Sequence, residues 1–102
     1  MTRTELHEKL VELIGNNNVY FQPPPTFQMN FPCFVYERAS GFTEYAEDMP
    51  YKHNQAYNLT YISKNPDSED FLRKIIFSFS SIRYNRHYTA NNLNYDSFII
   101  YN

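Results

Sequence analysis

Prolines constrain the fold of this chain more than any other feature, because they bound two short apolar segments. Residues 19–22 (Val-Tyr-Phe-Gln) run directly into the prolines at positions 23–25, which cannot donate hydrogen bonds to a β-ladder. Pro32 disfavours helical backbone at Phe31, and the apolar residues 33–36 follow it. We therefore predict two strands with an irregular connection between them, the second strand being well buried.

An amphipathic helix is predicted before the first strand. Its apolar residues recur at helical spacing: Leu6, Leu10, Leu13 and Ile14. Thr2 or Thr4 can cap its N-terminus, and Glu5 stands three residues after Thr2, as in a capping box. Gly15 is expected to end the helix, because glycine accepts the left-handed backbone of a helix C-cap. We expect this helix to cover a sheet.

The second half of the chain contains a further helix between strand-like segments. Residues 55–63 alternate apolar and polar side chains, which predicts a half-exposed strand. Asp67 or Ser68 can cap the helix that follows. Its core-facing stripe is expected to comprise Phe71, Leu72, Ile75, Ile76 and Phe79. Residues 82–88 and 95–101 are predicted to form a closing hairpin.

The order of these elements predicts an α+β fold. We expect one domain over residues 1–102, with a mainly antiparallel sheet and both helices packed on one face. A long loop at about residues 39–54 shows no sustained period, and such excursions are usually functional or disordered. It mixes aromatic and acidic side chains: Phe42, Glu44, Tyr45, Glu47, Asp48 and Tyr51. This mixture favours a loop that docks on a partner over one that is only solvated.

Composition limits the classes of partner. The chain has 9 basic and 11 acidic residues, whereas a sequence-independent nucleic-acid binder normally carries a clear basic excess. Its 10 tyrosines leave some to spare for surfaces that are buried against a partner. The single cysteine, Cys33, excludes an internal disulfide and is expected to be a buried apolar side chain. No apolar run approaches the ~20 residues of a membrane span, so we expect a soluble protein made in a reducing cytosol.

No pattern of catalytic or metal-binding residues stands out. The three histidines, His7, His53 and His87, lack the spacing of a metal site. With 2 glycines the chain has no phosphate-binding loop, and no nucleophile-elbow sequence surrounds a serine. The acidic side chains of Asp67, Glu69 and Asp70 fit the N-terminal charge of a helix better than a cation site. We therefore predict no enzyme activity and no cofactor.

Residues 82–88 leave two interpretations open. Strict alternation would place Arg83, Asn85 and His87 on one face and Tyr84, Arg86 and Tyr88 on the other. Arginines and tyrosines on a sheet can stack bases of single-stranded nucleic acid, here through Arg83, Tyr84, Arg86 and Tyr88. Alternatively the strand meets acidic residues of a neighbouring subunit, from Glu37, Glu44, Glu47 or Asp48. The net charge of -2 favours the subunit interface.

Two segments of the chain resemble a known family. Residues 18–24 (NVYFQPP) and 29–38 (MNFPCFVYER) follow a predicted helix. The arrangement resembles small neck proteins of long-tailed bacteriophages, the tail-terminator or tail-to-head joining family. In those proteins an N-terminal helix leads into a Val-Tyr-x-x-x-Pro strand, and an aromatic-Pro-x-aliphatic-Val-Tyr strand follows. The resemblance covers most of the chain, although no single residue defines the family.

The resemblance implies a mechanical function in the virion. Such proteins are small α+β domains that assemble, usually as six-fold rings, on the tail tube in the host cytoplasm. The implied partners are the tail tube protein and head-completion or connector proteins, and DNA passes through the lumen without specific binding. Six domains of this size in contact would leave a hole of about 34 Å, which is wide enough for duplex DNA.

The interface candidates for such a ring lie in two patches. They are Phe42, Glu44, Tyr45, Glu47, Asp48 and Tyr51 in the long loop, and Arg83, Arg86 and Tyr88 in the later strand. A head-completion or minor capsid protein of the same neck is one alternative. A single-stranded nucleic-acid-binding module is another, and a small enzyme or regulatory domain is a distant third.

Overall fold

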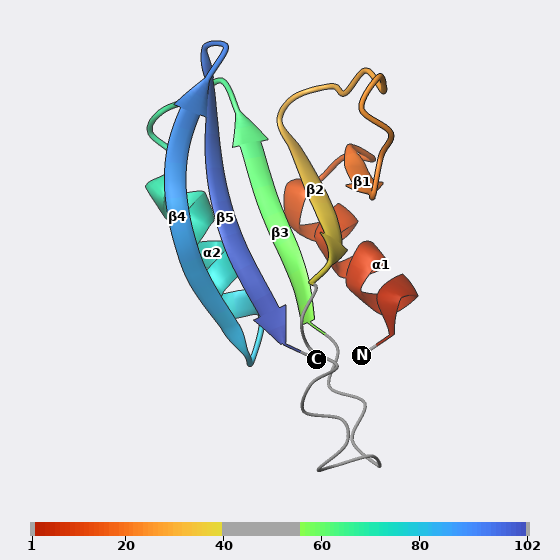
Figure 1. The fold of residues 1–102 in the computed structure, drawn as a ribbon. Coiled ribbons are helices and arrows are strands. Elements are labelled where there is room, and N and C mark those ends of the chain that lie inside the picture. The colour runs from red at the N-terminus through yellow and green to blue at the C-terminus, as the bar shows by residue number, and fades with distance from the viewer. Residues whose placement is uncertain (1, 40–55, 102) are drawn as a thin grey trace.

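The computed structural model describes residues 2–39 and 56–101, which form two helices and a five-stranded sheet (Figure 1). In chain order the elements are α1 (Arg3–Ile14), β1 (Val19–Phe21), β2 (Cys33–Arg38), β3 (Ala56–Ser63), α2 (Glu69–Ser78), β4 (Ile82–Ala90) and β5 (Leu93–Tyr101). Each predicted helix and strand is present. The prediction that residues 55–63 are half-exposed was wrong, because β3 lies in the middle of the sheet and none of its residues is exposed. The interface residues predicted in the long loop lie outside the described residues.

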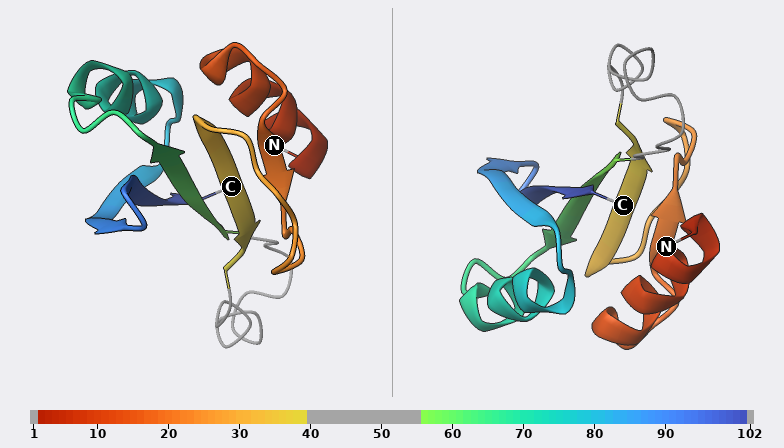
Figure 2. Two further views of the ribbon diagram at one scale, coloured as in Figure 1. Left: turned by 90° about the horizontal axis from the view of Figure 1, so that it is seen from above. Right: turned by 90° about the horizontal axis from the view of Figure 1, so that it is seen from below.

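The sheet is mixed, with strand order β1-β2-β3-β5-β4. β1 pairs with β2 in parallel, and the remaining neighbours pair antiparallel. Figure 2 shows that α1 and α2 lie on the same face of the sheet, α1 toward β1 and β2 and α2 toward β4 and β5. The predicted α+β class with both helices on one face is confirmed. No described helix covers the opposite face, which we call the open face.

Local signals account for α1. The Thr2 side chain accepts a hydrogen bond from the Glu5 backbone N–H at 3.2 Å, and the Glu5 carboxylate accepts one from the Thr2 backbone N–H at 2.9 Å. This capping box satisfies two amide groups that a helix N-terminus otherwise leaves unpaired. Gly15 ends the helix with φ 77°, a left-handed backbone that glycine adopts without strain.

Helix α1 packs on β2 through apolar side chains and one buried hydroxyl. Leu6 and Leu10 are buried against the sheet, and Tyr36 below them is fully buried. The Tyr36 hydroxyl lies 2.8 Å from His7 Nδ1 and accepts a hydrogen bond from Arg3 at 3.3 Å. These partners matter because a buried hydroxyl without a hydrogen bond destabilises the fold.

Helix α2 packs on the sheet through an aromatic cluster. The Phe71 ring lies 4.8 Å from the Tyr61 ring and 6.0 Å from the Phe34 ring, measured between centroids. Ile75 is fully buried beneath the same helix. Ile76, predicted to face the core, is instead 36% exposed. The prediction for Ile76 was wrong because adjacent helical residues point about 100° apart, and this helix buries only a narrow stripe.

The two neighbouring isoleucines give a test of this packing. We expect Ile75→Ala to lower the free energy of unfolding by about 2–5 kcal/mol, because it opens a cavity in the core. Ile76→Ala removes the same atoms from a partly solvated site and should lower it by about 1 kcal/mol or less. Urea unfolding of the two variants measures the difference. Equal losses would show that α2 sits in a different rotation about its axis.

Candidate binding surface on the open sheet face

A β-bulge in β4 decides which side chains share a face of the sheet. Tyr84 pairs with Phe98, but Arg86, two residues later, pairs with Ser97, the immediate neighbour of Phe98. Asn85 is therefore an extra residue without a partner in β5. A bulge of this kind shifts the alternation of the strand by one residue.

The bulge corrects the alternation predicted from sequence. Arg83 pairs with Ile99 before the bulge, and Arg86 and Tyr88 pair with Ser97 and Tyr95 after it. Residues paired directly across a ladder share a face, so Arg83, Arg86 and Tyr88 all lie on the open face. Tyr84 and His87, separated by the strict alternation, instead lie together on the helix side. Arg86 and Tyr88 therefore share a face with Arg83, and not with Tyr84 as predicted.

On the helix side, Tyr84 and His87 share one buried carboxylate. The Tyr84 hydroxyl donates to Asp96 Oδ1 at 2.9 Å, and His87 Nδ1 lies 2.8 Å from the same oxygen. Asp96 is buried, with 4% of its surface exposed. Partial burial and the neighbouring Asp96 carboxylate raise the pKa of Tyr84 to about 12, and burial is the larger cause. Tyr84 is thereby held by a contact within the domain and is not offered to a ligand on the open face.

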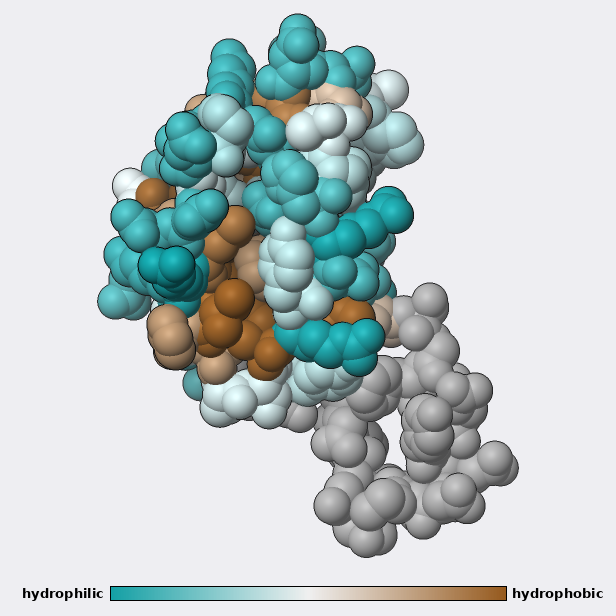
Figure 3. Space-filling view, turned by 90° about the vertical axis from the view of Figure 1, so that its left-hand side faces the viewer, coloured by the Kyte–Doolittle hydropathy of each residue, from teal (hydrophilic) through white to brown (hydrophobic). Residues whose placement is uncertain are grey.

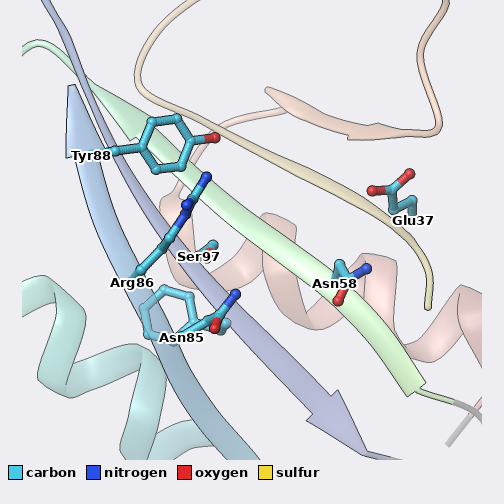
Figure 4. Close-up of a pocket in the computed structure, with 7 residues that line it drawn as sticks. Glu37, Asn58, Asn85, Arg86, Tyr88 and Ser97 are labelled. Carbon is cyan, nitrogen blue, oxygen red and sulfur yellow. The ribbon is translucent and has the colours of Figure 1, made fainter. Parts of the chain in front are cut away.

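On the open face, the strands form a shallow trough of about 380 Å³ (Figure 4). Its lining comes from four neighbouring strands: Glu37 from β2, Asn58 from β3, Ser97 and Phe98 from β5, and Asn85, Arg86 and Tyr88 from β4. Figure 4 shows Arg86 and Tyr88 at one end and Glu37 at the other, with Asn58 between them. The trough therefore carries a cation and an anion at opposite ends.

The cationic end of the trough is built on stacked rings. The Arg86 guanidinium carbon lies 4.8 Å from the centroid of the Tyr88 ring. The Tyr88 ring stacks on the Tyr95 ring across the ladder, with centroids 4.7 Å apart and planes 5° from parallel. A cation over an aromatic ring is attracted to its face, so the ring restricts where the guanidinium can point.

Several polar groups in the trough have no partner within residues 2–39 and 56–101. The hydroxyl of Ser97 is buried and makes no hydrogen bond there. Neither Arg86 nor Glu37 forms an ion pair with another described residue. Buried polar groups in folded proteins are nearly always paired, so an unpaired hydroxyl at the base of a trough indicates a position for water or for a ligand.

The remaining reactive side chains of the described residues are a buried thiol and two hydrogen-bonded histidines. Cys33 is fully buried, and burial raises the pKa of its thiol to about 12, which makes it a poor nucleophile. His7 and His87 bond to Tyr36 and Asp96. No group of three or more potential metal ligands gathers in the described ranges. In the same ranges no helix has both the length and the apolar character of a membrane span.

The predicted interface residues divide into two sets. The structure brings Arg83, Arg86 and Tyr88 together on the open face. The others, Phe42, Glu44, Tyr45, Glu47, Asp48 and Tyr51, lie outside the described residues. Sequence reasoning missed Asn58 and Ser97. The available signal was that each is a polar residue next to large apolar ones, Asn58 between Tyr57 and Leu59 and Ser97 before Phe98.

Comparison with protein-family models, with curated proteins and with solved structures gives no match. The resemblance to phage neck proteins therefore stays a prediction from the residues quoted above.

Two single-residue deletions, one in β4 and one in β5, test the bulge. Deletion of Asn85 leaves Tyr84 opposite Phe98 and Arg86 opposite Ser97, so the folded domain should survive with a loss of about 1 kcal/mol or less. Deletion of Ser97 from β5 should abolish cooperative unfolding, because a one-residue slip turns Phe98 and Ile100 out of the core. Circular dichroism during urea titration measures both. Similar damage from the two deletions would contradict the bulge.

The raised pKa of Tyr84 predicts a change of stability at high pH. The unfolded chain loses this proton near pH 10 and the folded protein near pH 12, so the contribution is present below 10 and is lost as pH rises to 12. Tyr84→Phe should therefore flatten the decline of unfolding free energy over this interval. Urea unfolding of the wild type and of this variant at several pH values between 10 and 12 measures the decline. A Tyr84→Phe curve parallel to the wild type would refute the assignment.

Proposed function

We propose that this chain is a structural protein of a phage neck or tail. Its function is that of a ring-forming tail terminator, which caps the tail tube and joins it to the head-completion proteins. The resemblance of residues 18–24 and 29–38 to that family supports the proposal, and so does the exposed edge of β4. The second observation carries the structural argument, because ring assembly needs surfaces on each subunit that are left open for its neighbours.

Strand β4 presents a long edge to which no strand of the described residues is paired. The strand has nine residues, every residue after Ile82 is exposed, and among the described strands β4 pairs with β5 alone. An edge of this length offers a row of unpaired backbone groups to another chain, and native proteins usually cover or block such edges. Within residues 2–39 and 56–101 nothing covers it. A neighbouring subunit that packs along β4 would do so.

Apolar side chains accompany this edge. Figure 3, which faces the side of the molecule where β4 lies, shows apolar residues gathered on its lower part. Among the exposed large apolar residues are Phe77 at 85% and Ile76 at 36%, both near the end of α2, and Tyr84 at 41% on β4. Grouped apolar residues beside an open edge are typical of a surface that is buried on assembly.

The positive charges on β4 favour a contact in which the neighbouring subunit contributes a surface other than its own β4. Arg83 and Arg86 on β4 make no ion pair with any described residue. Pairing β4 with β4 of a second copy would bring these cations toward one another, which destabilises a two-fold dimer. A contact between β4 and a different, acidic patch is heterologous, and such contacts form a ring when the rotation between neighbouring subunits closes.

Two alternatives share part of this support. A head-completion or minor capsid protein of the same neck would use the same edge. A single-stranded nucleic-acid module would need Tyr84 beside Arg86 and Tyr88, but Tyr84 lies on the other face and bonds to Asp96. The structure therefore weakens the nucleic-acid alternative as it was drawn from the sequence.

Particles formed without the protein test the function directly. Negative-stain electron microscopy would image the products of a phage that carries this gene and of its deletion derivative. A tail terminator predicts overlong tails beside filled, tailless heads. Tails of normal length that fail to join heads would place the protein on the head side of the joint, and ordinary virions would refute the structural function.

The apolar end of α2 gives a test at residue level. Phe77→Ser should change the unfolding free energy of the isolated domain by about 0.5 kcal/mol or less, because the ring is 85% exposed. It should lower the yield of complemented particles by about tenfold or more, the effect of losing ~1.4 kcal/mol of contact energy. Phe27→Ser, another exposed phenylalanine away from β4, is the control. Equal yields from the two variants would contradict the proposed interface.

A further inference from the structure

We propose that the trough on the open face is a docking site for an extended protein segment that carries one acidic and one basic side chain. Arg86 would bind the carboxylate, and Glu37 would bind the basic group. The site differs from the outer edge of β4 and does not depend on the number of copies in an assembly. The trough shares Arg86 with the proposed ring contact, and it adds Glu37, Asn58 and Ser97, which the ring contact does not use.

Arg86 is suited to a carboxylate. A guanidinium presents two parallel N–H groups that match the two oxygens of a carboxylate, and this fork binds best when its orientation is already restricted. The Tyr88 ring, 4.8 Å away, provides that restriction, and the Tyr95 ring supports Tyr88 from across the ladder. With no ion-pair partner among the described residues, the charge of Arg86 is available to a ligand.

The middle of the trough is suited to a polypeptide backbone. The buried Ser97 hydroxyl has no hydrogen bond in the described part of the chain. The amide side chains of Asn58 and Asn85 line the same trough, and each can both donate and accept. A peptide group offers one donor and one acceptor per residue, so an extended segment can satisfy these groups in turn.

The distance between the charged ends sets the spacing of the ligand. Glu37 is on β2 and Arg86 is on β4, with β3 and β5 between them. Three strand spacings amount to about 14 Å. Glu37 is level with Ile99 of β5, whereas Arg86 pairs with Ser97 two residues away, so the diagonal separation is about 16 Å. An extended chain rises about 3.3 Å per residue and points alternate side chains to one face, so we expect the acid and the base about four residues apart, with the long side chains covering the remaining distance.

A nucleic acid fits the trough less well. Its backbone carries negative charge along its whole length, so the end at Glu37 would repel it. The net charge of the chain, -2, adds no general attraction for a polyanion. A segment with charges of both signs meets a complementary group at each end.

The test is an NMR titration of the full chain with three synthetic peptides and one oligonucleotide. The first peptide, Gly-Glu-Ser-Gly-Ser-Lys-Gly with blocked ends, has its acid and base four residues apart. The second replaces Lys with Glu, the third replaces Glu with Lys, and the oligonucleotide is ten thymidines. We expect saturable shifts at Asn58, Asn85, Arg86 and Ser97 with the first peptide, at least about fivefold tighter than with the other probes. No saturation by about 10 mM, equal binding of the like-charged peptides, or tighter binding of the oligonucleotide would each overturn the proposal.

Variants of the full chain locate the binding. Arg86→Gln should weaken the first peptide by about tenfold or more, and Arg86→Lys should fall between that variant and the wild type, because lysine keeps the charge but not the fork. Glu37→Gln should remove the preference for the first peptide over the second, because it removes the group that binds the lysine, and should keep the preference over the third. Arg73→Gln, an exposed arginine on α2, should bind like the wild type. Unchanged affinity in Arg86→Gln, with its amide spectrum intact, would overturn the assignment.

Discussion

The extra residue at Asn85 is the constraint on which the functional reading of this domain depends. Without the bulge, the face of each later β4 side chain would be reversed relative to the residues before it. With it, Arg83, Arg86 and Tyr88 all reach the open face, and His87 joins Tyr84 over Asp96 on the other. One inserted residue therefore separates a cationic, solvent-facing surface from a hydrogen-bonded cluster inside the fold.

The two faces of the sheet have different tasks. Both helices and the buried aromatic cluster of the described residues lie on one face, where Phe34, Tyr36 and Phe71 are packed with their neighbours. Burial of that face supplies the stabilisation of the fold, since apolar burial is its largest favourable contribution. The open face and the edge of β4 are not needed for this core. They can carry charged and unpaired groups whose partners lie outside the domain.

The sequence predicted most of the fold because its signals are local. Thr2 with Glu5 marks the start of α1, and Gly15 marks its end. Features that depend on pairing were not predictable in the same way. The parallel pairing of β1 with β2 follows from the path of the connection between them, and no periodicity encodes it. The bulge at Asn85 is visible only when residues of β4 are counted against those of β5.

The sequence predicted part of the candidate site, because some of its residues are recognisable within one strand and others depend on strand order. Arg86 and Tyr88 are conspicuous on their own strand, so sequence reasoning found them. Asn58 and Ser97 became part of the site only through the strand order, which places β3 and β5 between β2 and β4. Ile76 was assigned to the core because helical spacing alone does not fix how wide a stripe the helix buries.

Hydrogen exchange of the protein, free and within assembled phage particles, tests the central claim that the β4 edge meets a neighbouring subunit. Amide exchange would be followed by mass spectrometry over peptides covering α2, β3 and β4. The account predicts that assembly slows exchange in β4 and at the end of α2, because unpaired edge amides gain partners, while β3 inside the sheet is unchanged. Unchanged exchange in β4, with protection appearing only elsewhere, would contradict it.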